Sequence, residues 1–395
     1  MPKLPATIVA IFAYAIMSGF VTQSGVILRP AATDFGRSVT ETAPLFSYLL
    51  GGNLVGFLLC LVVFDVLTIK RVLVLAYAAV FVGVALFTAT HLFAVASIAI
   101  ALIGFGAGIG LSAGAVIITR TYGENRRAAA FLGTDCAFSV AGFIFPAIAG
   151  TAIVAGYGWR TGYLVVAGVA ALLVIAALRI RFPEAAPRAQ RASSETGAAT
   201  KASIAGVVLF GLGLCLYLCG QSVFLIWAPT YLQTNLAVPM VRANAVVGSF
   251  WGPSIFGLIT AGLIVTRVPP RLVLLVATCS AVVCTSVLAA TSSPQLFFTL
   301  TLVFGFSSTC MYKLMISIGS EQVPSPPPQL VTFLLLSGAI GGTIAPALSG
   351  HVVHAFGPHA GPVMAFGCYA GALAVIVLAL LIERSARRVL PAFSS

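Results

Sequence analysis

Long apolar runs separated by short charged segments fill almost the whole chain of 395 residues. A run of about 18 or more apolar residues is long enough for a helix to cross a membrane core of about 30 Å at about 1.5 Å per residue. Twelve runs reach this length. The sequence therefore predicts an all-α membrane protein with twelve transmembrane helices, the first ending near Leu28 and the others at roughly 43–64, 71–90, 94–119, 129–153, 161–179, 203–229, 243–266, 271–290, 295–318, 329–352 and 361–382.

The composition agrees with a surface that mostly faces lipid. Apolar residues make up 60% of the chain and charged residues only 8%, whereas soluble domains have about 25% charged residues. The net charge of +12 lies mainly in the loops between the apolar runs. Membrane topology explains this charge, so we expect a lipid bilayer and no nucleic acid as a partner.

Part of the fifth predicted span recurs about 200 positions later in the chain. Phe145–Gly150 aligns with Ala345–Gly350, and Gly142 aligns with Gly342. Upstream, the Gly-Phe pair at Gly104 has its counterpart at Gly305. A duplication of this length in an apolar chain is typical of a transporter built from two similar halves.

The repeat predicts two pseudo-symmetric six-helix bundles, residues 1–180 and residues 203–395, the second ending in a short cytoplasmic tail. The segment 181–202 between them is rich in Pro, Ala, Ser and charge and has no apolar period. We interpret it as a flexible cytoplasmic linker.

Lys and Arg are distributed unequally between the two sets of predicted loops. Sixteen lie on the side that holds the N-terminus, and four lie on the other side, namely Arg29, Arg37, Arg160 and Arg242. Because Lys and Arg are enriched in short cytoplasmic loops, we expect both termini in the cytoplasm. The remaining cation, Lys313, lies inside a span.

Two charged residues lie within the predicted spans, one in each half. Asp135 is near the cytoplasmic start of the fifth span, and Lys313 is at a similar depth near the cytoplasmic end of the tenth. A charge at mid-membrane costs about 2.5–3.5 kcal/mol even on the insertion scale, so it needs a partner or a function. We expect the two to form a breakable ion pair that closes the cytoplasmic side, with Asp135 sensitive to protonation. The alternative for Lys313 is snorkelling to the headgroups.

Six further residues are candidates for binding a solute near the middle of the membrane. Amide groups beside an aromatic face suit a hydroxylated or amide-bearing solute, and an arginine offers a cation to an anionic one. The alternatives are hydrogen bonds between helices for the amides, packing for the tryptophans and a position at the interface for the arginine. The candidates are Gln23, Arg29, Asn53, Gln221, Trp227 and Trp251.

The cytoplasmic ends of the first bundle carry charges that are candidates for a second gate. Asp65 ends the second span and Arg71 follows it, while Arg120 and Glu124 lie in the next cytoplasmic loop. A carboxylate such as Asp65 is stabilised beside the N-terminus of a helix from the other half, here the one starting near residue 329. The alternative is that these charges only set the topology.

Signatures of metal sites and enzymes are missing from the sequence. The four histidines show no metal spacing with carboxylates, and the eight cysteines lie within apolar runs without a Cys-x-x-Cys pair. His351 and His354 lie three residues apart near an outer helix end and could share a face, which leaves a proton or metal role there as a minor alternative. There is no Gly-x-Ser-x-Gly or His-Glu-x-x-His motif. We therefore expect no metal, no cofactor and no enzymatic activity.

Four stretches, Thr134–Pro146, Gly220–Pro229, Ser249–Trp251 and Gly319–Pro324, carry a family resemblance. With them the chain resembles the major facilitator superfamily and, over nearly its whole length, the TsgA-type branch near the fucose–galactose–glucose proton symporters. The resemblance implies proton-coupled alternating access and matches Asp135 and Gln221 to positions of the branch.

The chain departs from this resemblance in two places. The superfamily's cytoplasmic motif, Gly-x-x-x-Asp-Arg-x-Gly-Arg-Arg, is only partly present at Asp65–Arg71, where the central Gly and the first Arg are missing. The branch usually has an uncharged residue where this chain has Lys313, which favours an anion over a neutral sugar as the solute.

From these features we expect a monomeric secondary active transporter in the inner membrane of a bacterium. It would move a small polar solute together with protons, by rocking of the two halves about a site at the midplane. One alternative is a proton-driven efflux antiporter, because Gly142–Gly150 partly matches the antiporter motif. The other alternative is a non-transporting receptor or assembly factor on the same fold.

Overall fold

The computed structural model describes residues 3–122, 124–182, 201–323 and 328–389. These residues form fifteen α-helices joined by short turns. Twelve membrane-length segments among them are apolar enough to cross a bilayer. The predicted all-α fold with twelve spans is therefore confirmed.

The helices fall into two groups along the chain, with the first group ending at residue 179. Its members are α1 (Lys3–Thr22), α2 (Ser24–Asp34), α3 (Val39–Thr42), α4 (Leu45–Val66), α5 (Ile69–Ala89), α6 (Phe93–Thr121), α7 (Glu124–Val154) and α8 (Thr161–Arg179). The second group starts at residue 201 and comprises α9 (Lys201–Thr234), α10 (Met240–Ile264), α11 (Pro270–Ala290), α12 (Pro294–Ser308), α13 (Met311–Ser320), α14 (Pro328–Phe356) and α15 (Ala360–Val389). Most of the predicted linker, residues 183–200, lies outside the described part of the chain.

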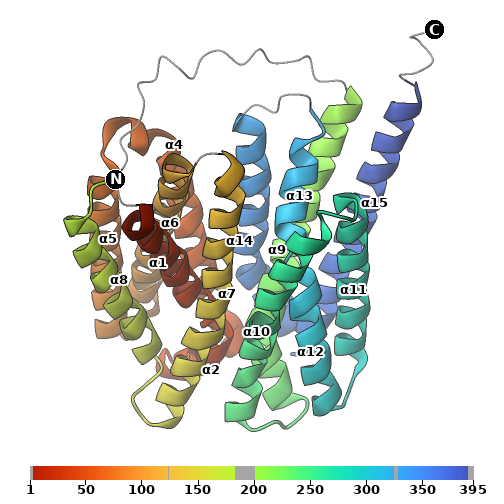
Figure 1. The fold of residues 1–395 in the computed structure, drawn as a ribbon. Helices are drawn as coiled ribbons and strands as arrows, with labels where there is room; N and C mark the ends of the chain where they lie inside the picture. Colours follow the sequence, from red (N-terminus) through yellow and green to blue (C-terminus); the bar gives the residue numbers. More distant parts are fainter. Residues whose placement is uncertain (1–2, 123, 183–200, 324–327, 390–395) are drawn as a thin grey trace.

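The two groups stand side by side, each packed mainly against its own members (Figure 1). They meet along a seam in which α7 contacts α10, α4 contacts α14 and α2 contacts α9. The start of α1 and the end of α15 lie at one face of the molecule, called here the terminal face (Figure 1). The opposite face, where α7 connects to α8 and α9 to α10, is called the far face.

Two of the predicted spans are interrupted, which the apolar pattern did not indicate. The first breaks at Gln23, whose backbone carbonyl accepts from two successive N–H groups and whose side-chain amide donates to the Gly19 carbonyl over 2.5 Å. The tenth breaks between α12 and α13, where Thr309 donates to the Gly305 carbonyl over 2.8 Å. Backbone angles at both breaks stay helical, so each span continues in nearly the same direction.

Within the first group, α4 and α6 are joined by a reciprocal glycine contact. A Cβ atom on Gly104 of α6 would overlap the backbone carbonyl of Leu49 on α4. In the same way, a Cβ atom on Gly52 of α4 would overlap the carbonyl of Ala101 on α6. Only glycine on both helices lets two backbones approach this closely in a membrane.

The second group repeats this arrangement between α10 and α12. A Cβ atom on Gly305 of α12 would overlap the carbonyl of Phe250, and one on Gly257 of α10 would overlap the carbonyl of Phe306. Gly104 and Gly305 are the positions that the sequence repeat aligned. The duplication therefore reappears as the same helix contact in both groups.

Arg160 at the far face holds together three of the loops that connect helices of the first group. Its guanidinium donates to Asp34 over 2.7 Å and to the backbone carbonyls of Phe87 and Thr90 over 3.1 and 2.6 Å. The guanidinium also lies 4.4 Å from the ring centroid of Trp159. Because its planar guanidinium donates to several acceptors at once, this arginine holds the loops around it in place.

Candidate functional site

An ion pair spans the seam on the terminal-face side. The Lys313 Nζ atom on α13 lies 3.2 Å from the Oδ2 atom of Asp135 on α7. The Asp135 side chain is 17% exposed, and that of Lys313 is 46% exposed. Since the partners come from different groups, the pair joins the two groups, and the Lys313 side chain stays only half-buried.

Two tyrosines, one from each group, interact electrostatically with the Asp135 carboxylate. Tyr14 on α1 interacts with the side chain of Thr134 and lies close enough to Asp135 for an electrostatic interaction. Tyr312 on α13 also interacts electrostatically with Asp135, and its ring centroid is 5.6 Å from the Lys313 Nζ atom. We did not predict these tyrosines, because an aromatic residue in an apolar run gives no sign of which face it occupies.

Trp251 on α10 continues the seam next to this pair. Its ring centroid lies 5.5 Å from that of Phe138, one turn beyond Asp135 on α7. A Cβ atom on Gly142 would come within 2.8 Å of the indole, so the glycine makes room for the ring. The indole Nε1 is buried without a hydrogen-bond partner among the described residues. The wall beside the pair is therefore aromatic.

Asn244 lies two turns from Trp251 on α10, and the sequence analysis did not single it out. Both of its amide atoms are buried without hydrogen-bond partners among the described residues. A Cβ atom on Gly150 of α7 would lie 3.8 Å from atoms of both Asn244 and Val26. The amide is therefore buried where α2, α7 and α10 meet.

The remaining amide candidates lie away from the ion pair. Gln221 donates to the Tyr217 hydroxyl over 3.1 Å within the second group. The Oε1 atom of Gln23 points at Gly162 on α8, and the Oδ1 atom of Asn53 points at Gly108 on α6. These two amides lie in helix contacts inside the first group, but their oxygens have no hydrogen-bond partner among the described residues, so these atoms do not form the hydrogen bonds between helices given as the alternative.

Trp227 also takes a packing position rather than one in the seam. Its indole Nε1 donates to the Ser349 hydroxyl over 2.8 Å, and 1% of the residue is exposed. Both residues belong to the second group, on α9 and α14. The structure therefore brings Asp135, Lys313 and Trp251 to one side of the seam and leaves Gln23, Asn53 and Trp227 inside the groups.

The far-face end of the seam is closely packed. A Cβ atom on Gly25 of α2 would overlap the carbonyl of Leu225 on α9. One turn further, Arg29 donates to the Gln233 side chain over 3.2 Å, again from the first group to the second. Arg29 therefore lies in a contact that closes the far face.

The charges predicted as a second gate lie at the terminal face. Asp65 is exposed at the end of α4, and Arg71 is exposed in the first turn of α5, where Thr68 caps the helix. Arg120 lies in the last turn of α6. The side chain of Glu124 and the start of the helix near residue 329 lie outside the described side chains, so a gate here stays a prediction.

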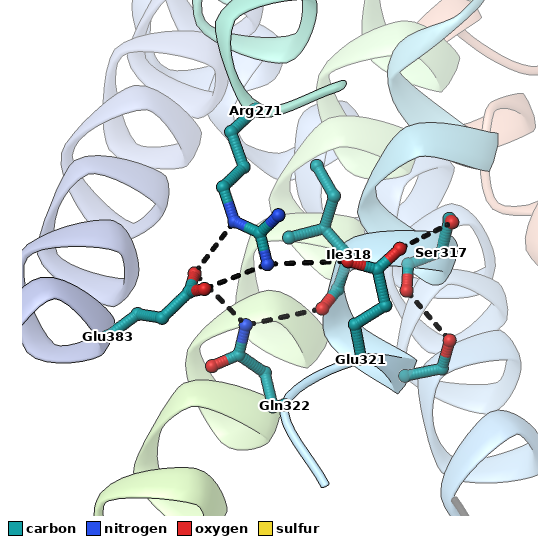
Figure 2. Close-up of polar contacts among 7 residues, drawn as sticks. Arg271, Ser317, Ile318, Glu321, Gln322 and Glu383 are labelled. Atoms are coloured by element: carbon teal, nitrogen blue, oxygen red, sulfur yellow. Dashed lines mark hydrogen bonds and ion pairs between the residues drawn. The ribbon is translucent and has the colours of Figure 1, made fainter. Parts of the chain in front are cut away.

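A charged cluster anchors α13 at the terminal face (Figure 2). Arg271 at the start of α11 donates to Glu383 on α15 over 3.0 Å, and its Nη2 atom lies 3.3 Å from the carboxylate of Glu321 at the end of α13. Gln322 donates to the Ile318 carbonyl over 3.2 Å. This cluster fixes the terminal-face end of the helix whose other end carries Lys313.

A metal site finds no support in the described part of the chain. No group of three or more His, Cys, Asp or Glu side chains gathers there.

Comparison with known proteins identifies the fold. Residues 6–328 match the family described as Major Facilitator Superfamily. The chain is 28% identical to a protein named TsgA homolog from Erwinia tasmaniensis over 359 residues, which is 91% of this chain and 90% of that protein. It is also 28% identical to Protein TsgA from Salmonella arizonae over 369 residues, 93% of each chain.

Two solved structures share this architecture. The nucleoside transporter NupG has a TM-score of 0.71 at 13% identity, with 97% of this chain and 99% of that chain covered. The peptide transporter POT in complex with sulfate has a TM-score of 0.74 at 13% identity, with 96% and 94% covered. At this identity the likeness shows the fold alone. The family match and the twelve spans together make this chain a member of the major facilitator superfamily, a multi-pass membrane transporter of a small solute and not an enzyme.

Proposed function

We propose that the chain is a secondary active transporter that carries a small polar solute together with protons by alternating access. One observation carries the proposal: the ion pair of Asp135 and Lys313 joins the two groups near the terminal face. The far-face end of the same seam is closed by close backbone contact at Gly25. One end of the seam is thus held by an ion pair that protonation can break, and the other by a backbone contact. This difference suits a transporter that opens one end at a time.

Protonation of Asp135 is the step that couples protons to this movement. A neutral carboxyl group loses most of its attraction for the Lys313 ammonium, so the contact between α7 and α13 weakens. Both side chains are partly exposed, which supports access of a proton to Asp135 while the pair is formed. Releasing the pair lets the two groups separate at the terminal face.

The distribution of Lys and Arg supports a cytoplasmic location for the terminal face. The TsgA relatives come from bacteria, which supports the inner membrane as the location. We propose a monomer, because in this arrangement the seam and both charged partners belong to one chain.

The test is uptake into proteoliposomes driven by a pH gradient. A thermal-shift screen of the purified protein against sugars, amino acids and organic acids first identifies a solute, because a ligand of the folded state raises the melting temperature. Asp135→Asn should then abolish uptake driven by the pH gradient while leaving solute exchange without a gradient. Glu41→Gln is the control, because that carboxylate caps α3 away from the pair. Unchanged pH dependence in Asp135→Asn would refute the proton role.

Charge reversal tests the pair itself. Asp135→Lys and Lys313→Asp should each lose activity, and the double variant should recover part of it because the opposite charges face each other again. Impaired single variants without recovery in the double variant would argue against a functional pair.

The direction of transport separates symport from the efflux antiporter. The segment around Gly142, which suggested an antiporter, packs against Trp251 on α10. Such a close helix contact is expected in a symporter and in an antiporter, so it does not separate the two. In proteoliposomes a symporter moves solute and protons the same way, whereas an antiporter acidifies one side as solute leaves it. A receptor or assembly factor would move no solute in either arrangement.

A further inference from the structure

We propose that the solute is a small monocarboxylate whose carboxylate group replaces that of Asp135 on Lys313 after Asp135 is protonated. The inference rests on the proposed proton-coupled transport and names its substrate class. Its starting point is that the Lys313 ammonium already holds a carboxylate at 3.2 Å, supplied by the protein itself. A solute with the same group can take over the same interaction.

The surroundings of the ammonium fit one negative charge. Lys313 is a compact point charge, and the ring of Tyr312, which carries an uncharged hydroxyl, lies 5.6 Å from its Nζ atom. A tyrosine hydroxyl donates a hydrogen bond to a carboxylate oxygen without adding charge. Phosphate and sulfate carry more charge and are commonly bound by arginine forks or by several cations, so a monocarboxylate matches this site better.

The wall beside the pair limits the rest of the solute. Phe138 lies three residues after Asp135 and therefore on the same side of α7, and the Trp251 ring packs against it. A second carboxylate placed here would face aromatic rings instead of a cation. The body of the solute is accordingly uncharged.

The charges balance through the exchange. Before binding, Lys313 is positive, Asp135 is negative, and the pair is neutral. A hydronium ion then gives a proton to Asp135, forming an O–H bond and leaving water, and the solute carboxylate takes the place of Asp135 on Lys313, so the site is again neutral. One proton and one carboxylate therefore cross together without net charge movement, which avoids the cost of carrying a charge through the membrane.

The experiment measures binding to the purified full-length chain at acidic and neutral pH. The probes are acetate, lactate, pyruvate and benzoate, each paired with its primary amide, which keeps the shape and removes the charge. At least one acid should raise the melting temperature, more strongly at acidic pH, and its amide should not. Lys313→Gln should weaken binding of that acid about tenfold to hundredfold, as expected for losing a hydrogen bond to a charged group.

Two further variants keep the test decisive. Lys313→Arg retains the charge and should keep binding within about tenfold, even if Lys313→Gln folds poorly. Lys70→Gln is the matched control, because that lysine donates to the Leu178 carbonyl away from the seam and should leave binding unchanged. Equal binding of acid and amide, undiminished binding in Lys313→Gln, or no response to any of the four acids would overturn the inference.

The two proposals fail in different ways. A neutral solute whose uptake needs both the pH gradient and Asp135 would leave proton-coupled transport standing and overturn the carboxylate site. Binding of a carboxylate that depends on Lys313, without any uptake driven by the pH gradient, would leave the site standing and overturn the coupling.

Discussion

Gly25→Ala should open the far face of the transporter. In the structure α2 and α9 approach so closely that a Cβ atom on Gly25 would overlap the Leu225 carbonyl and lie 3.1 Å from the Ile226 carbonyl oxygen. Backbone atoms cannot swing aside as side chains do, so the two helices must separate. The contact joins the two groups, and the strain therefore acts against the state with a closed far face and not against either group alone.

The size of the effect follows from the cost of overpacking. Inserting a methyl group into a packed contact costs about 1–3 kcal/mol. Applied to the equilibrium between closed and open far faces, this lowers the ratio of closed to open molecules by about 5-fold to 150-fold. A closed state that dominates in the unaltered chain should then share the population with the open one.

Distances between spin labels measure this shift. Labels attached at Thr33→Cys and Asn235→Cys report on the far-face ends of α2 and α9, in a background without the eight native cysteines. Gly25→Ala should increase the fraction of molecules in which the two labels lie far apart. The matched control is Gly168→Ala on α8, where a Cβ atom would meet nothing within 4 Å. A distance distribution in Gly25→Ala that superimposes on that of the unaltered chain would refute the reasoning.

Three further predictions concern stability, measured as thermal unfolding in detergent. Arg160→Lys should lower the free energy of unfolding by about 1–3 kcal/mol, because an ammonium cannot serve Asp34 and the carbonyls of Phe87 and Thr90 together; exposed Arg267→Lys is the control, and equal losses in both would contradict the role of the fork. Glu383→Gln should destabilise more than Glu321→Gln, because the Glu383 side chain is 12% exposed and that of Glu321 is 48% exposed; the reverse order would show that burial does not set the strength of this cluster. Trp227→Phe should cost about 1 kcal/mol through its lost bond to Ser349, and additive losses in the double variant with Ser349→Ala would mean that the bond contributes nothing.

The fold could be predicted largely from the sequence because a membrane leaves few choices. Apolar runs that span the bilayer must be helices, since the lipid offers no hydrogen-bond partners to an open backbone. The breaks at Gln23 and Thr309 escaped prediction because both lie inside membrane-length apolar runs. The hydropathy pattern therefore does not mark them.

The candidate site could be predicted only in part. Asp135 and Lys313 stood out because a charge is costly in an apolar run, and the structure brings these two side chains together. Whether the pair works as a gate is left to the experiments above. Gln23, Asn53 and Trp227 belong to residue types that serve binding and helix packing alike, and only the position of each side chain around its helix distinguishes the two uses. That position depends on neighbouring helices that the local sequence does not specify.

The paired glycines between α4 and α6, and between α10 and α12, determine which helix contacts stay rigid during transport. Each glycine of a pair lies against a backbone carbonyl of the other helix, so the two helices cannot slide along each other without a steric clash. Each pair of helices therefore moves as one rigid unit. Displacement during a transport cycle must then be taken up where α7 faces α10 and α4 faces α14. Backbone amide hydrogens in these two helix pairs should exchange slowly with solvent throughout turnover. Inherited substitutions that change the transport rate should accumulate next to the glycine contacts and not at the glycines themselves.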